Sequence, residues 1–269
     1  MIIMDDGESK KTFDDFQMIC EMGGPYPETP EFRHITTKIP GQLGLIKVGV
    51  ENNSESFSFP LFLNERDLRY RRKILNDLKE FLFDDLGNPK EIKIIFLDET
   101  DKFFKVECSS QISINKILPG SRFDLEFVSH DPLKYSIVNA DEITWGSTEI
   151  TFESTTYTYG HEGMDSSFNI KSATTKKIDV IGLALQPQIS IWGRATNLVI
   201  TNQGNKITVG TFANKLWEID CEKYIAYQDG VEKMIPMDKF MLRKGNNNVQ
   251  FSGTDMDIDV TIKFRDRWK

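Results

Sequence analysis

Apolar residues between positions 64 and 87 recur at intervals of three, four and seven, which is the pattern of one face of an α-helix. Charged residues occupy most of the remaining positions of this stretch. Asn64 can cap the first turn, and Gly87 followed by Pro89 is typical of a helix end. We therefore predict one amphipathic helix over residues 64–87, whose apolar face includes Leu68, Leu75, Leu78 and Leu82.

The predicted helix also carries a basic cluster that could grip phosphate groups. Acidic residues in the same helix offset its charge, so a charged exterior or a subunit contact is favoured over phosphate binding. The cluster consists of Arg69, Arg71, Arg72 and Lys73.

Most other apolar runs alternate with polar residues, which predicts β-strands. Strands flank the helix up to residue 129, where a His-Asp-Pro sequence breaks the pattern. In the second half, turn signals recur about every eight to twelve residues, which is typical of a β-sandwich or jelly roll. We predict a mainly β protein of two domains: residues 1–136 form a β-sandwich-like domain that carries the helix, and residues 137–269 form a second β-sandwich.

The composition is that of a globular chain, with 39% hydrophobic and 28% charged residues. No apolar run is long enough to predict a transmembrane helix, and the N-terminus does not resemble a signal peptide, so we expect synthesis and folding in the cytosol. The net charge of −8 disfavours tight binding to DNA or to an anionic membrane. The odd number of widely spaced cysteines predicts free thiols rather than a disulfide framework.

The sequence contains no recognisable catalytic, cofactor or metal motif. None of its three histidines is spaced for metal binding with another histidine or a cysteine. Asp255, Asp257 and Asp259 alternate along one strand and could form a calcium site or a catalytic pair, but a solvated strand face is favoured. Aromatic residues of the second half could stack on sugars if exposed together. Trp192 and Trp217 lie on strongly apolar strands, so a core position is favoured for both.

A turn motif separates two β-prone runs in the first half. Proline fixes its own φ angle and glycine adopts angles that other residues avoid, so the motif is interpreted as turn geometry. It is not a dinucleotide-binding fingerprint, because it lacks the required glycine spacing and the following helix. The motif consists of Ile39, Pro40, Gly41 and Gly44.

The order of these segments resembles that of siphophage distal tail proteins (Dit), the phage tail component family. Residues 33–44 resemble the Ile-Pro-Gly turn of the first domain in that family, and a strand, an amphipathic helix and a strand ending in Asp131-Pro132 follow in the same order. The second half is similar to the galectin-like C-terminal domain of the family. The segments that resemble it are residues 187–193, 198–202, 218–220, 243–249 and 260–268.

The resemblance implies a structural, non-enzymatic protein of the virion that needs no cofactor and is assembled in the host cytoplasm. Dit proteins form a hexameric ring through their N-terminal domains at the distal end of the tail. The ring joins the tail tube protein to the tail-associated tip protein and to receptor-binding or baseplate proteins, and DNA passes through its channel without specific binding. No insertion into a membrane is expected.

Two other functions are weighed against this one. The first is a carbohydrate-binding adhesin that uses the galectin-like domain to attach to the host cell wall, which requires exposed, clustered aromatic side chains. The second is a β-sandwich glycosidase, which requires two carboxylates that face each other in a cleft. The hub function ranks above both because the resemblance extends over nearly the whole chain.

Overall fold

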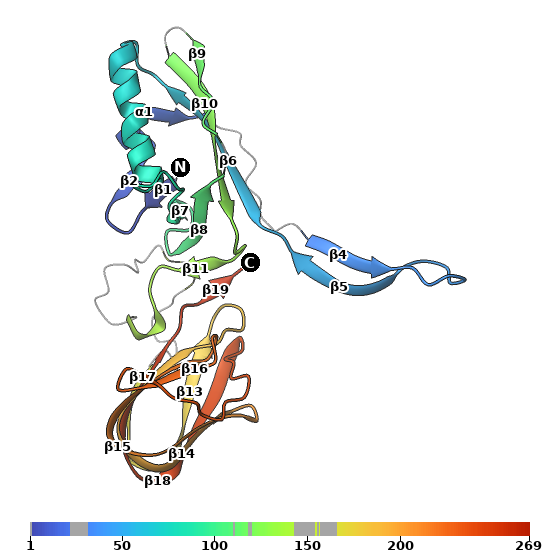
Figure 1. Cartoon of the computed structure of the whole chain (residues 1–269), viewed down its shortest axis with the longest axis vertical. Helices are drawn as coiled ribbons and strands as arrows, with labels where there is room; N and C mark the ends of the chain where they lie inside the picture. The colour runs from blue at the N-terminus through green and yellow to red at the C-terminus, as the bar shows by residue number, and fades with distance from the viewer. Residues whose placement is uncertain are drawn as a thin grey trace. The chain divides into compact units, whose positions relative to one another are not determined.

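A computed structural model describes residues 2–21, 32–109, 111–117, 120–142, 154, 156 and 166–269. The chain divides into two compact units, residues 1–134 (with Lys269) and residues 135–268. The predicted mainly β fold with one α-helix is confirmed for the part of the chain described (Figure 1). That helix is not long and apolar enough to cross a membrane.

The first unit contains an antiparallel sheet in the order β2-β1-β7-β8-β10-β6-β3, with β9 paired to β10. β6 and β10 pair over nine positions, from Glu55 opposite Ser129 to Leu63 opposite Ser121. The elements in chain order are β1 (Ile2–Asp5), β2 (Lys10–Thr12), the 3₁₀ turn η1 (Asp14–Phe16), β3 (Met18–Cys20), β4 (Phe32–Thr37), β5 (Ile46–Asn52), β6 (Glu55–Leu63), α1 (Leu68–Leu82), β7 (Ile92–Phe96), β8 (Lys102–Cys108), β9 (Asn115–Ile117) and β10 (Gly120–Ser129).

Helix α1 packs an apolar stripe into the core of this sheet, but it is shorter than the predicted 64–87. Its N-cap is Asp67 rather than Asn64, and the Asp67 carboxylate accepts a hydrogen bond of 2.8 Å from the backbone N–H of Arg69. The chain becomes extended at Phe83, so Gly87 (φ +83°) belongs to the turn that follows the helix. The side chains of α1 that are buried in this core are those of Ile74, Leu78, Phe81 and Leu82.

The predicted apolar face of the helix needs one correction. Leu78 and Leu82 are buried and Leu75 is partly buried against the core. Leu68, however, is 66% exposed. It is the first residue of α1, and the first buried apolar residue of the helix is Ile74, almost two turns later.

Arg71 is a second correction, because it is buried and does not belong to a charged exterior. Its guanidinium donates hydrogen bonds to the carbonyl oxygens of Glu65 and Gly120 and to the Ser121 hydroxyl, at 3.0–3.1 Å for the Nε and Nη1 contacts. Nη2 also contacts the Glu65 oxygen. These bonds tie the first turn of α1 to the start of β10.

The second unit is built around one antiparallel sheet in the order β12-β18-β14-β15-β16-β17, with β13 paired to β18. Further β-pairing joins β11 to β19. β11 (Lys134–Ser136) begins at the last residue of the first unit. The other elements are the 3₁₀ turn η2 (Ala140–Glu142), β12 (Ser167–Ile170), β13 (Thr174–Val180), β14 (Gln188–Asn202), β15 (Asn205–Asp220), β16 (Ile225–Gln228), β17 (Val231–Glu232), β18 (Gly245–Lys263) and β19 (Arg267–Trp268).

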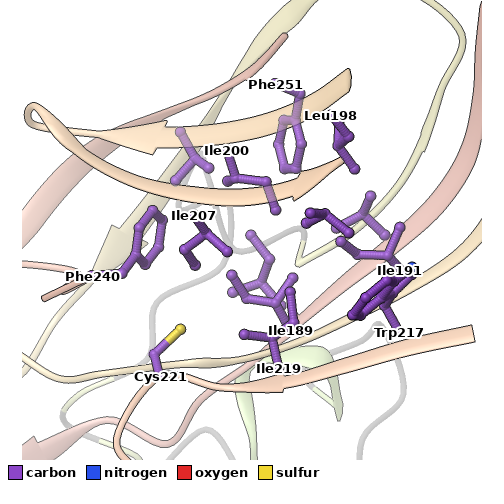
Figure 2. Packing of buried hydrophobic residues seen from close by; sticks show 14 of the residues in the cluster. Ile189, Ile191, Leu198, Ile200, Ile207, Trp217, Ile219, Cys221, Phe240 and Phe251 are labelled. Carbon is purple, nitrogen blue, oxygen red and sulfur yellow. The ribbon is translucent and has the colours of Figure 1, made fainter. Parts of the chain in front are cut away.

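Three of these strands are long and bent, although turn signals every eight to twelve residues in the sequence predict short strands. β14, β15 and β18 span 15, 16 and 19 residues, and register shifts interrupt the β14 pairing between Gly193 and Val199. The bends let the two halves of each strand enclose one apolar core. Figure 2 shows Leu198 and Phe251 on one side of that core, with Ile189 and Ile219 on the other.

The cysteines are free thiols, as predicted. Cys108 and Cys221 are buried and Cys20 is partly buried. Burial, with a smaller contribution from neighbouring Asp220, raises the pKa of the Cys221 thiol to about 12. This thiol is therefore neutral near pH 7 and acts as a small apolar core residue.

Replacing the Arg71 side chain tests its role in joining helix to sheet. Arg71→Met leaves buried carbonyl and hydroxyl groups without their charged donor, so we expect a loss of roughly 2–4 kcal/mol in unfolding free energy. The exposed neighbour Arg72→Met is the control and should change stability by less than about 0.5 kcal/mol. Urea unfolding of both variants measures the difference. Equal stabilities would show that the buried guanidinium contributes nothing.

The buried carboxyl of Glu55 should make the stability of the protein depend on pH. It is 5% exposed, and burial raises the pKa of its carboxyl, with Lys134 opposing the shift. A carboxyl whose pKa is raised by folding contributes to stability at pH values below its ordinary pKa of 4.5. This contribution to stability is lost as the pH rises through the folded-state pKa.

We therefore expect Glu55→Gln to raise the melting temperature at pH 7 and to have little effect below pH 4.5. The amide lacks the buried negative charge that costs stability at neutral pH. Exposed Glu126→Gln on β10 is the control. Thermal unfolding from pH 4 to pH 8 measures the difference, and a lower melting temperature for Glu55→Gln at pH 7 would contradict the expectation.

A candidate assembly surface on the β4–β5 hairpin

The β4–β5 hairpin forms a two-stranded sheet of its own (Figure 1). The strands pair antiparallel from Phe32 opposite Asn52 to Thr37 opposite Ile46, with a register shift after Ile35. Neither strand pairs with any other strand of the described residues. We call residues 32–52 the hairpin arm. Its two outer edges therefore present backbone N–H and C=O groups that can pair with another strand.

The turn motif identified in the sequence forms the tip of this arm. Gly41 and Gly44 have φ angles of +88° and +93°, a region that residues with a side chain rarely adopt. The backbone N–H of Gln42 donates to the Ile39 carbonyl at 3.1 Å, which closes the turn together with Pro40. These backbone angles and this hydrogen bond reverse the chain between β4 and β5.

The arm exposes an unusual number of large apolar side chains. Every residue of β4 is exposed, and so are all residues of β5 except Gly49. Leu43, Leu45 and Val48 are 106%, 63% and 66% exposed. An isolated hairpin is marginally stable in water, and contiguous exposed apolar surface marks an interaction site. The other exposed apolar residues of the arm are Phe32, Ile35, Ile39, Ile46 and Val50.

The charge of the arm is opposite to that of the rest of the chain. The arm carries three basic residues (Arg33, Lys38 and Lys47) and one acidic residue (Glu51), so its net charge is +2. The whole chain carries −8, so the other residues together carry −10. An apolar, basic arm on an acidic protein is complementary in charge to a second copy of the same protein.

The remaining predicted site residues lie elsewhere in the first unit. Leu78 and Leu82 of α1 lie in the core of the first unit, and Leu75 packs against that core. Leu68 is exposed, and none of the four leucines belongs to the hairpin arm. Among the described residues, no group of three or more His, Cys, Asp or Glu side chains could hold a metal ion. The apolar residues of β5 were predicted as strand residues, but nothing in their alternation indicated that they are exposed.

Comparisons with known proteins assign the first unit to a family. Residues 15–129 match the model of the phage tail protein RIFT-related domain. The crystal structure of Dit (gp 19.1) from phage SPP1, a paradigm of the hub adsorption apparatus in phages that infect Gram-positive bacteria, matches with a TM-score of 0.69. The match has 14% identity and covers 100% of both chains, so it shows a shared fold.

Two baseplate structures of phage P2 are more distant. The structures of its activated conformation with Ca and with Sr each have a TM-score of 0.39 and 14% identity to this chain. The matches cover 98% of this chain and 98% and 97% of the respective baseplate chains. No curated protein sequence matches at a significant level.

Proposed function

Because this chain is a siphophage Dit-like protein, we propose that it is a structural, non-enzymatic hub of the phage tail. It forms a hexameric ring at the distal end of the tail in the virion and is assembled in the host cytoplasm. The ring joins the tail tube to the tail-tip protein and the host-binding apparatus. Support comes from the phage tail domain over residues 15–129 and from the Dit-like fold.

The hairpin arm is the observation that carries this proposal. Each copy inserts its arm against the acidic surface of the next copy, which buries the exposed apolar side chains and pairs opposite charges. A head-to-tail contact of this kind closes into a ring when the rotation between copies is a simple fraction of a turn. The first unit is therefore the ring-forming unit, and the tip motif from Ile39 to Gly44 determines how far the arm reaches.

The remaining features of the hub are inferred from the same family. The second unit is a galectin-like domain that holds receptor-binding or baseplate proteins, an assignment supported by the antiparallel sheet of long, bent strands among its described residues. DNA passes through the central channel of the ring. The net charge of −8 favours passage without tight binding, because phosphate groups are held by clustered lysine and arginine.

Light scattering and negative-stain images of the full-length protein test the ring. We expect six-fold rings, formed by the protein alone or when tail tubes of the same phage are added. A protein that stays monomeric under both conditions at high concentration contradicts the hub function.

A triple variant tests the contribution of the arm. Leu45→Ser, Val48→Ser and Val50→Ser together remove apolar contacts worth roughly 3 kcal/mol or more, so ring dissociation should increase by about 100-fold or more. The control, Val231→Ser with Met234→Ser, changes exposed apolar residues outside the arm. Unchanged circular dichroism and melting temperature establish that both variants fold. Rings that persist in the triple variant would exclude the arm as the contact.

A further inference from the structure

Trp192 in the second unit is exposed, contrary to the core position favoured by its sequence. It is 51% exposed, whereas Trp217 is 5% exposed and lies in the core. The two tryptophans differ because Ile189 and Ile191 of β14 point inward, so Trp192 points to the outer face of the sheet. The indole of Trp192 is therefore accessible to a ligand on this face of the sheet.

The indole borders a small polar hollow of about 400 Å³. Trp192 lies opposite Asp259 in the pairing of β14 with β18, and Arg194 lies opposite Asp257. Gly193 between them allows a close approach of the two strands, because a Cβ there would lie 2.2 Å from the Asp257 carbonyl oxygen. The residues that line the hollow are Trp192, Gly193, Arg194, Asn214, Asp257 and Asp259.

The side chains in the hollow offer both donors and acceptors. Asp259 accepts a hydrogen bond of 2.7 Å from the Asn169 amide, which orients the carboxylate and leaves its second oxygen for a ligand. The side chains of Arg194 and Asp257 make no hydrogen bond or ion pair with another side chain among the residues described. Carboxylates accept hydrogen bonds from hydroxyls, whereas guanidinium and amide groups donate them.

We propose that this hollow binds a saccharide whose pyranose ring stacks on Trp192. The C–H face of a pyranose is apolar and matches the indole face, while its equatorial hydroxyls extend sideways toward polar groups. Asp257 and Asp259 accept hydrogen bonds from these hydroxyls, and Arg194 and Asn214 donate to them. With two carboxylates and one guanidinium the hollow has a net charge of −1, which favours neutral or amino sugars over phosphate-rich polymers.

Other ligands fit the hollow less well. A docked protein buries about 800 Å² on each side around an apolar centre, whereas a single tryptophan among charged side chains supplies one apolar contact. A metal ion needs several converging oxygen ligands, and no such group occurs among the described residues. The site does not depend on ring formation, so it can be tested on a protein of any oligomeric state.

Calorimetric titration of the full-length protein tests the site. The probes are chitotetraose, a galactose tetrasaccharide, a rhamnose tetrasaccharide and, as an anionic polymer, poly(glycerol phosphate). We expect at least one neutral oligosaccharide to bind with a dissociation constant of about 1 mM or below. Absence of binding to all three oligosaccharides up to about 10 mM, or a preference for the phosphate polymer, would overturn the proposal.

Variants then locate the site. Trp192→Ala should weaken binding by about tenfold or more, Asp257→Asn should also weaken it, and Trp192→Phe should restore part of the affinity. Tyr227→Ala is the matched control, because Tyr227 is an exposed aromatic on the same sheet outside the hollow. Affinity that is unchanged in both Trp192→Ala and Asp257→Asn would place the sugar elsewhere and reject the assignment. Unchanged melting temperatures establish that the variants fold.

Discussion

The apolar face of every amphipathic element must be covered, and this requirement organises the molecule. In the first unit, α1 and the long β6–β10 pair cover one another, and Leu78 of the helix is completely buried. In the second unit, the two halves of each bent strand enclose the apolar core between them. The hairpin arm is built on the same alternation, with Ile46, Val48 and Val50 on every second position, but no described element covers it. The apolar side chains of the arm are therefore left exposed among the described residues, and this exposure is what the proposed contact between copies would remove.

Local patterns in the sequence predicted which helices and strands form better than they predicted what packs against each residue. The period of the leucines indicated one helix and strand alternation indicated a mainly β protein, because both patterns follow from backbone geometry. The fates of Leu68 and Arg71 depend on what lies next to them in space. Leu68, the first residue of α1, is exposed. Arg71 is buried, and the start of β10 supplies acceptors for its guanidinium. The spacing of apolar residues along the helix predicts neither the exposure of Leu68 nor the burial of Arg71.

The long strands of the second unit show a different limit. Asn197 and Gly210 adopt φ angles of +55° and +85°, and their residue types are typical of turns between short strands. In the structure these positions lie within continuous strands that bend, and irregular pairing replaces a chain reversal. Strand parity then decides exposure, which is why Trp192 faces outward although its strand is as apolar as that of Trp217. Composition alone could not separate these two tryptophans.

The two surfaces proposed here have opposite chemistry, and this difference matches the tasks assigned to them. The arm is apolar and basic, so burying it against another copy would give a stable contact, as the proposed ring requires. The hollow at Trp192 is small and polar, so its binding to one saccharide is weak and reversible. Six copies in a ring would each present such a hollow, and the effective concentration created by the first contact would strengthen the next. Assembly through the arm would thus convert a weak sugar site into firm attachment to a surface covered with repeated saccharides.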